Sequence, residues 1–206
     1  MSGLHELTSG EIFLDGTPVV GPRPDAVGMV FQEANLLPWR NLVQNIVFPF
    51  EIRHRPIDWR RINSLLEETG LAGFEKSAPR ELSGGMQQRA SIVRALAQDP
   101  EVLLMDEPFG ALDAFTRDEM NLLLLRLWGE TQKTIVFVTH NISEAIFLGD
   151  RVVVMTPRPG RLARIFDIDF PRPRTIEMTF QPEFIELIQE IKRAVETGAR
   201  QTVEVE

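Results

Sequence analysis

Two neighbouring carboxylates follow a continuous apolar run, at the point where a buried strand would end. The run Val102-Leu103-Leu104-Met105 leads directly into Asp106 and Glu107. A carboxylate at a strand end can hold Mg²⁺, usually through water, because this ion keeps much of its hydration shell. The adjacent carboxylate can act as a general base on a water molecule. The pair could therefore hold a metal ion and activate a water molecule, and the plainer alternative is that Glu107 only caps a turn or pairs with an arginine.

A glycine turn that opens a helix is the second chemical element. It reads Leu-Ser-Gly-Gly-Met-Gln-Gln-Arg over residues 82–89. Ser83 is a good N-cap, and the backbone N–H groups of Gly84 and Gly85, together with the helix dipole, form an anion site. Glycine also lets a ligand come close to the backbone. A simple capped turn is true as well, but it does not account for the polar residues 87–89 that follow.

Two more polar residues stand just beyond predicted strands. Gln32 follows the apolar run 27–31, and His140 follows the apolar run 134–139. In an open parallel sheet, ligands bind at the carboxyl ends of the strands. Packing alone does not require polar groups at three strand ends, so Gln32, Asp106-Glu107 and His140 are predicted to share one site.

The elements that position these residues form an α/β pattern. Strands alternate with helices through residues 100–155, which predicts a parallel sheet. Asp15-Gly16 predicts a hairpin near the N-terminus. Residues 41–98 are nearly all helical, with an interruption or bend expected near Pro49. The predicted helices are 41–52, 58–69, 83–98, 113–131, 142–148 and 182–196, the strand 151–155 is expected to pair with 161–166 across the turn 157–160, and 169–175 is expected to be a linker.

Composition narrows the function classes. The chain has 206 residues, of which 43% are hydrophobic, with a net charge of −8. This indicates one domain with a sizeable core, and the acidic balance argues against a general nucleic-acid binder. No cysteine is present and histidines number only three, so neither a cysteine–zinc site nor a histidine metal cluster is expected. No apolar run approaches the roughly 18 residues of a membrane span, and no signal-peptide pattern opens the chain, which favours a cytoplasmic protein.

The order of these motifs resembles the ATP-binding subunit of ABC transporters. The resemblance rests on Gln32, the run 82–89, Asp106-Glu107-Pro108, Ala111-Leu112-Asp113 and His140, and it covers about residues 9–156. The runs 31–39, 109–113 and 155–161 are similar to the branch that imports nitrate, sulfonates and taurine. The implied fold class is α/β, with a P-loop NTPase-like parallel sheet flanked by helices and a helical signature subdomain at about 40–98.

The resemblance also implies ATP and Mg²⁺ as cofactors and a role for each site residue. Asp106 and Gln32 would hold the metal, and the catalytic residues would be Glu107, His140 and Gln32. The signature would bind ATP held by a second subunit, through residues reaching across a head-to-tail dimer: Ser83, Gly84, Gly85, Gln87 and Asp113.

The implied partners are a second ATPase subunit, transmembrane permease subunits and, indirectly, a periplasmic or lipoprotein solute-binding protein. Such a subunit lies on the inner face of the cell membrane and contacts no nucleic acid. Trp39 could face a membrane partner or lie in a loop, and the arginines of residues 151–174 are interpreted as a solvated face. Residues 169–206 would form a C-terminal extension.

One expected motif is absent from the sequence. A phosphate loop follows the pattern G-x-x-x-x-G-K-[ST], but the three lysines, Lys76, Lys133 and Lys192, all lack a preceding glycine. Residues 1–12 resemble the end of the helix that follows this loop, so we expect a chain truncated at its N-terminus, without the N-terminal strands. Loss of an interior strand would expose sheet edges and favour aggregation. Such a chain is not expected to hydrolyse ATP efficiently alone.

Alternative functions remain open at this point. The chain could be a non-catalytic partner that donates its signature in a mixed ATPase dimer, or an inactive gene fragment. A soluble member of the superfamily that acts in DNA repair or translation is a further alternative. The short insertion between Gln32 and Ser83, the lack of a long coiled coil and the acidic charge argue against it.

Overall fold

The structure, a computed structural model, describes residues 2–158 and 160–203. It divides into two compact units, one built on residues up to 116 with 131–138 and the other on 117–130 with 139 onward. Helix α4 (Ala114–Thr131) contributes to both. Met1, Pro159 of the predicted turn and the last three residues of the predicted C-terminal extension lie outside the described residues.

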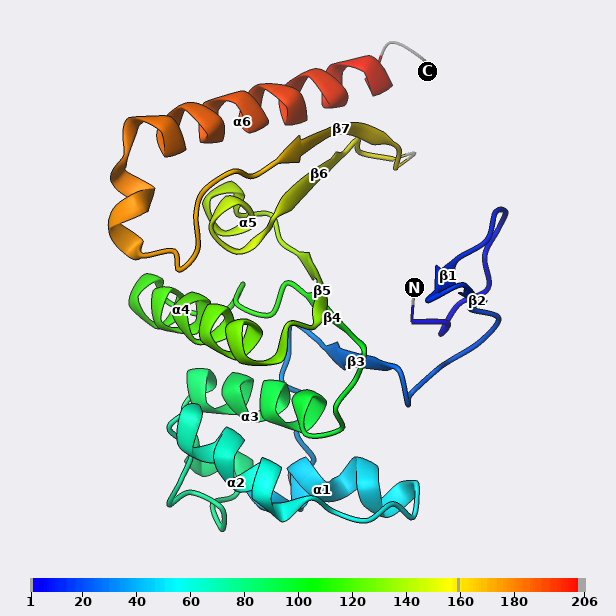
Figure 1. The fold of residues 1–206 in the computed structure, drawn as a ribbon, viewed down its shortest axis with the longest axis vertical. Coiled ribbons are helices and arrows are strands. Elements are labelled where there is room, and N and C mark those ends of the chain that lie inside the picture. Colours follow the sequence, from blue (N-terminus) through cyan, green and yellow to red (C-terminus); the bar gives the residue numbers. More distant parts are fainter. Residues whose placement is uncertain (1, 159, 204–206) are drawn as a thin grey trace. The chain divides into compact units, whose positions relative to one another are not determined.

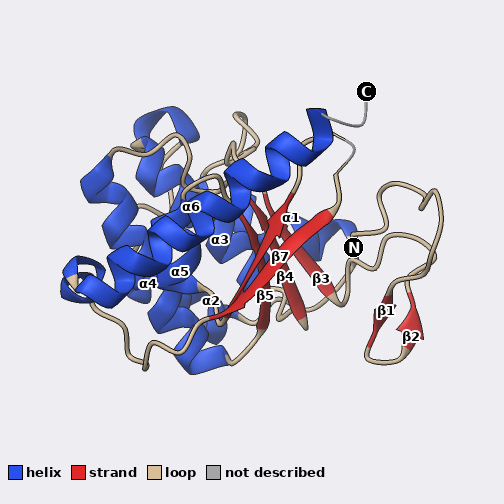
Figure 2. Ribbon diagram, turned by 90° about the horizontal axis from the view of Figure 1, so that it is seen from above, coloured by secondary structure: helices blue, strands red, loops and turns tan. Residues whose placement is uncertain are grey.

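A three-stranded parallel sheet forms the centre of the first unit. Its strands are β3 (Val27–Val30), β4 (Val102–Asp106) and β5 (Thr134–Val138), in the order β3-β4-β5 (Figures 1 and 2). The register pairs Val30 with Met105, and Met105 with Phe137, so the carboxyl ends of the strands are level. This confirms the predicted α/β class with a parallel sheet.

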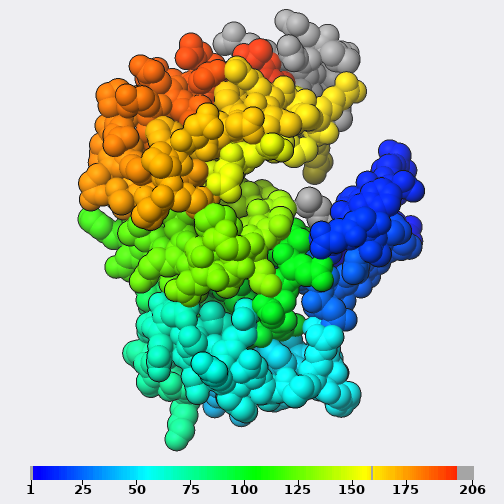
Figure 3. All heavy atoms as spheres, in the orientation of Figure 1, coloured from blue at the N-terminus to red at the C-terminus, as the bar shows by residue number. Residues whose placement is uncertain are grey.

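Three helices belong to the same unit as this sheet, and each begins at a polar N-cap residue. They are α1 (Leu42–Ile52), α2 (Trp59–Glu68) and α3 (Gly84–Leu96), with the caps Asn41, Asp58 and Ser83, and the short 3₁₀ turn η1 (Pro79–Glu81) precedes α3. Their apolar faces bury Ile46, Ile62 and Ile92 completely. Helix α1 continues through Pro49 to Ile52 rather than ending there. Helices α1 and α2 form a continuous part of the surface, cyan in Figure 3.

The predicted N-terminal hairpin is confirmed. Strands β1 (Phe13–Leu14) and β2 (Thr17–Pro18) pair antiparallel. Asp15 and Gly16 both have positive φ, 46° and 73°, which is the backbone of a type I′ turn. An Asp-Gly pair is the sequence that this turn favours because glycine adopts positive φ without steric cost.

The second unit contains an antiparallel hairpin covered by helices. Strands β6 (Arg151–Met155) and β7 (Leu162–Asp167) pair with each other, and α5 (Ile142–Leu148), η2 (Ile176–Phe180) and α6 (Pro182–Val203) complete the unit. Val152 and Val154 are buried, while Val153 and Met155 are exposed. The predicted pairing of 151–155 with 161–166 is therefore confirmed. The prediction that the parallel sheet extends through residue 155 is wrong for β6, because among the described strands β6 pairs with β7 alone.

Strand β5 has an open edge in the first unit. Among the described strands it pairs only with β4. Its side chains are apolar, yet Val138 is 51% exposed and residues 135–137 are only partly buried. Continuous apolar strands are typical of sheets covered on both faces, and an open apolar edge favours association with another strand. In the described part of the chain, no helix is both long enough and apolar enough to cross a bilayer.

Candidate nucleotide and metal site

Gln32 and Glu107 converge on one glycine, Gly110. A Cβ atom placed on Gly110 would lie 3.5 Å from Gln32 Nε2 and 3.6 Å from Glu107 Oε2. The N–H of Gly110 donates to the carbonyl of Glu107 (3.1 Å), and the N–H of Glu107 donates to the carbonyl of Val138 (2.9 Å). Both side chains therefore lie beside the same glycine.

Glu107 has an unusual backbone conformation. Its φ is 44°, in the left-handed region, which costs of order 1–3 kcal/mol in a residue that is not glycine. The hydrogen bond to Val138 on the neighbouring strand holds this turn in place. The chain thereby turns sharply out of β4 directly after Asp106, which leaves the Asp106 side chain exposed.

The donor atoms of this region suit Mg²⁺. Asp106 and Glu107 supply carboxylate oxygens and Gln32 supplies an amide oxygen, which are the ligands that this ion prefers. Among the described residues, no group of three or more histidine, cysteine or acidic side chains could hold a metal alone. This is compatible with Mg²⁺, which usually takes only one or two protein carboxylates and fills its remaining positions with water and phosphate.

The signature turn presents an open helix N-terminus. Ser83 Oγ accepts a hydrogen bond from the N–H of Met86 (3.2 Å). Ser83 and Gly84 are exposed, and no described atom outside the adjacent turn and the helix backbone lies within 4 Å of a Cβ placed on Gly84. The backbone N–H groups at the start of α3 are therefore accessible to an anion.

Gln87 stabilises the signature turn through hydrogen bonds to the residues that precede it. Its Nε2 donates to the carbonyls of Pro79 (3.0 Å) and Leu82 (3.2 Å). These bonds tie the start of α3 to η1. The predicted contact of Gln87 with nucleotide stays a prediction, and the structure gives its side chain a supporting position.

Asp113 and Gly85 meet at Thr116. Asp113 accepts hydrogen bonds from the N–H (3.1 Å) and the hydroxyl (2.8 Å) of Thr116. These two bonds hold the pKa of its carboxyl below the ordinary value, and the bond from the N–H has the larger effect. A Cβ on Gly85 would lie only 2.8 Å from Thr116 Cγ2. The glycine is therefore needed for the signature helix to pack against the start of α4.

Two polar residues of α3, whose role the sequence did not reveal, bind the glutamine loop, residues 31–37. The Nε2 of Gln88, which is 3% exposed, donates to the carbonyl of Phe31 (3.1 Å). Arg94 donates to the carbonyls of Ala34 (2.8 Å) and Asn35 (2.9 Å), and burial lowers its pKa. The sequence offered one indication of this role, namely that Gln88 and Arg94 are polar residues on a helix that is mostly buried.

Asn45 of α1 holds the far end of the same loop. It is fully buried, its Oδ1 accepts from the N–H of Leu37 (2.6 Å), and its Nδ2 donates to the carbonyl of Leu37 (3.2 Å). The glutamine loop is thus attached to the signature helix at its start and middle and to α1 at its end. The bonds to Phe31 and Ala34 hold the backbone on both sides of Gln32.

Replacing Gln88 with leucine is expected to loosen the glutamine loop. The carbonyl of Phe31 would lose its donor, and the loss of one hydrogen bond of this kind costs about 0.5–1.5 kcal/mol of stability. Urea unfolding should show that loss, and hydrogen exchange should rise at residues 31–37. Gln189→Leu, the same change at an exposed position on α6, serves as the control and should alter neither. Equal exchange of the loop in both variants would contradict a holding role for Gln88.

His140 lies in the second unit and precedes α5. It is exposed, and hydrogen bonds of its two neighbours, Thr139 and Asn141, hold the backbone on either side of it. The N–H of Asn141 donates to Thr139 Oγ1 (3.0 Å), and Asn141 Oδ1 caps α5 by accepting from the N–H of Glu144 (3.2 Å). The position of His140 therefore depends on the position of the N-terminus of α5.

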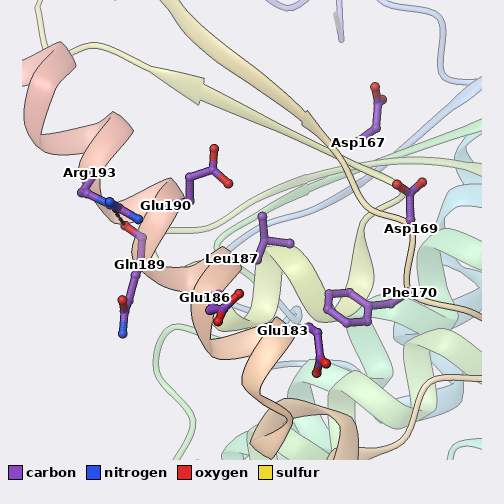
Figure 4. Close-up of a pocket in the computed structure, with 9 residues that line it drawn as sticks. All are labelled: Asp167, Asp169, Phe170, Glu183, Glu186, Leu187, Gln189, Glu190 and Arg193. Carbon is purple, nitrogen blue, oxygen red and sulfur yellow. Dashed lines mark hydrogen bonds between the residues drawn. The ribbon is translucent and has the colours of Figure 1, made fainter.

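A groove of about 580 Å³ beside α6 is a poor candidate for nucleotide. Figure 4 shows its carboxylates, which come from α6 and from the chain at the end of β7, with Phe170 and Leu187 among them. Five acidic residues line it against one arginine, namely Asp167, Asp169, Glu183, Glu186, Glu190 and Arg193. A triphosphate would be repelled by this charge.

Comparison with known proteins agrees with the motif order. A family model described as ABC transporter matches residues 1–110. The chain is 48% identical over 176 residues to an uncharacterized ABC transporter ATP-binding protein of Methanocaldococcus jannaschii, covering 84% of this chain and 66% of that protein. It is 45% identical over 202 residues to the taurine import ATP-binding protein TauB of Rhizobium johnstonii, covering 93% of this chain and 76% of that protein.

The fold is also similar to a solved structure. This is the dimeric, post-hydrolysis state of an ATP-binding cassette bound to ADP and Pi, with a TM-score of 0.69 and 32% identity. The match covers 82% of this chain and 78% of that one.

Proposed function

Because the chain belongs to the ABC transporter ATP-binding family, we propose that it is the energy-coupling ATPase subunit of an importer for a small anionic solute of the nitrate, sulfonate or taurine type. The observation that carries this proposal is the convergence of Gln32 and Glu107 at Gly110, directly after the exposed Asp106. The solute class rests on the motif variants at 31–39, 109–113 and 155–161 and on the similarity to a taurine import protein.

Each residue has a role in this proposal. Bound Mg²⁺ would supply charge stabilisation for the phosphates. Asp106 and Gln32 would hold the metal through their oxygens, and Glu107 would accept a proton from water. His140 would orient that water and contact the terminal phosphate. The strained turn at Glu107 supports this assignment, because strain of this kind gathers at functional sites.

The signature would act on nucleotide held by a second subunit. The open N-terminus of α3, residues 83–85, would bind its terminal phosphate, and Asp113 would lie at the same head-to-tail interface. The helical subdomain, about 40–98, would receive the permease, and Trp39, which is 76% exposed, lies at its edge. The assembly would sit on the inner face of the membrane and receive solute from a binding protein.

A second candidate function is that of a signature donor in a mixed dimer. The observation that favours it is that these 206 residues combine an accessible signature turn with no glycine–lysine pair. In such a dimer the partner's phosphate loop would hold ATP, and the turn at 83–85 would complete that site. Alone, these residues would not hydrolyse ATP efficiently.

Uptake by intact cells tests the importer proposal. Cells lacking the gene should lose ATP-dependent uptake of one solute among taurine, an alkanesulfonate and nitrate, and should take up a neutral sugar normally. Complementation should restore that uptake. Normal uptake of all three solutes, with recovery of the protein among ribosomal or DNA-repair proteins, would contradict it.

A further inference from the structure

Two arginines of the C-terminal segment bind the end of α5. The chain leaving β7 passes α5 before it enters η2 and α6 (Figure 1). Arg174 Nη1 donates to the carbonyls of Ile146 (2.9 Å), Phe147 (3.0 Å) and Gly149 (2.7 Å). Arg172 Nη2 donates to the carbonyl of Leu148 (2.8 Å).

These four carbonyls are the ones that a helix leaves without intrahelical partners at its C-terminus. Two guanidinium groups satisfy all four of them, from a segment more than twenty residues further along the chain. A positive charge also interacts favourably with the negative end of the helix dipole. Helix α5 is only seven residues long, so its own hydrogen bonds alone would leave it marginal.

The burial of Arg174 sets it apart from a surface arginine. Its side chain is 2% exposed, and its Nη2 lies 3.7 Å from the carboxylate of Asp150. Charged residues are almost never fully buried unless they are paired. The interpretation of residues 151–174 as a solvated face is therefore wrong for Arg174.

Arg172 joins α5 to α4. Its guanidinium lies 4.0 Å from the ring centroid of Trp128 on α4, a cation–π contact, while Nε and Nη2 donate to Asp150 (3.1 and 2.8 Å). The segment is itself anchored to α6, because Phe170 packs on the buried Phe184 with ring centroids 5.3 Å apart.

We propose that Arg172 and Arg174 form an arginine brace, through which the C-terminal segment positions α5 and therefore His140 at its start. The proposal rests on the function proposed for His140. The two arginines are positioning residues, because they contact the C-terminus of α5 and not the residues of the nucleotide site. The C-terminal segment would thus act on catalysis through the position of α5.

Hydrogen exchange and NMR of the full chain test the brace directly. Arg174→Met keeps an unbranched apolar stem but removes the guanidinium group and its donors. Amide exchange over 142–149 should rise about tenfold or more, since bonds from charged donors are lost locally, while α6 amides stay unchanged. The ring Cε1–H signal of His140, assigned with His140→Gln, should shift, and that of His54 should not.

Two further variants separate positioning from general destabilisation. Arg151→Met removes an exposed arginine that pairs with Asp167 and should change neither α5 exchange nor the His140 signal. If Arg174→Met does not fold, Arg172→Met decides, because that side chain is 22% exposed and its partners can reach water. Unchanged exchange of α5 and an unchanged His140 signal in the folded variant overturn the proposal.

The ATPase assay provides the functional readout. In the ATPase assembled with its second subunit, Arg172→Met should lower kcat more than it changes KM, because the position of His140 changes while Asp106 and Gln32 keep theirs. If His140→Gln leaves kcat unchanged, the proposed role of His140 is wrong, and the exchange and NMR data still decide whether the brace exists.

Discussion

Replacing Glu107 with glutamine is expected to lower ATP hydrolysis by the assembled ATPase by about 10²–10⁴-fold, which is the usual contribution of a general base. Glutamine has the same shape and can still hydrogen-bond, but it cannot accept a proton from water. Binding of ATP should persist because Asp106 and Gln32 are unchanged. Phosphate release at saturating Mg·ATP gives the rate, and a fluorescent ATP analogue gives the affinity.

Glu101→Gln is the matched control for this variant. Glu101 precedes the opposite end of β4 and is exposed, so the same chemical change falls on the same strand, far from the carboxyl ends. Its rate should equal that of the unmodified protein. If Glu107→Gln hydrolyses ATP as fast as this control, Glu107 is a residue of the turn and another group is the base.

The sequence predicted that the two carboxylates lie at the end of a strand, because the end of a buried strand can be recognised from the local pattern of apolar residues. Val102–Met105 is a continuous apolar run, and the strand β4 that it forms ends at Asp106. The caps Asp58 and Ser83 were predicted for the same reason, since a capping bond forms within three residues. Strand ends and helix caps can therefore be predicted from the sequence alone.

Contacts between distant segments were not predictable in this way. Gln88 meets Phe31 across 57 residues, and Arg174 meets Ile146 across 28 residues. Neither pair has a periodic pattern, and an arginine among other arginines resembles a solvated surface. The alternation of strands and helices through residue 155 wrongly predicted that 151–155 joins the parallel sheet, because this pattern does not distinguish such a strand from one that pairs locally, whereas the expected pairing of 151–155 with 161–166 is confirmed.

Replacing Ser83 with aspartate is expected to abolish the contribution of the signature turn without unfolding α3. Aspartate is as good an N-cap as serine, so the bond to the N–H of Met86 can be kept. Its negative charge would stand at an accessible helix N-terminus, where the proposed ligand is a phosphate. Facing like charges cost several kcal/mol, and each 1.4 kcal/mol is a factor of ten, so ATP-dependent dimerisation and hydrolysis should fall about 10²-fold or more.

Asn41→Asp is the control for this last variant, because it adds the same charge at the N-cap of α1 and also preserves a cap. Helix content by circular dichroism should match in both variants, while only Ser83→Asp should block association measured by light scattering with Mg·ATP. The same experiment separates the two proposed functions. Mixing the chain with a subunit that carries a phosphate loop should give one competent site if the chain is a signature donor, and Ser83→Asp should remove the activity of that site. Activity of the mixture that survives Ser83→Asp would exclude the signature turn from nucleotide binding, because the cap, and with it the fold of α3, is kept.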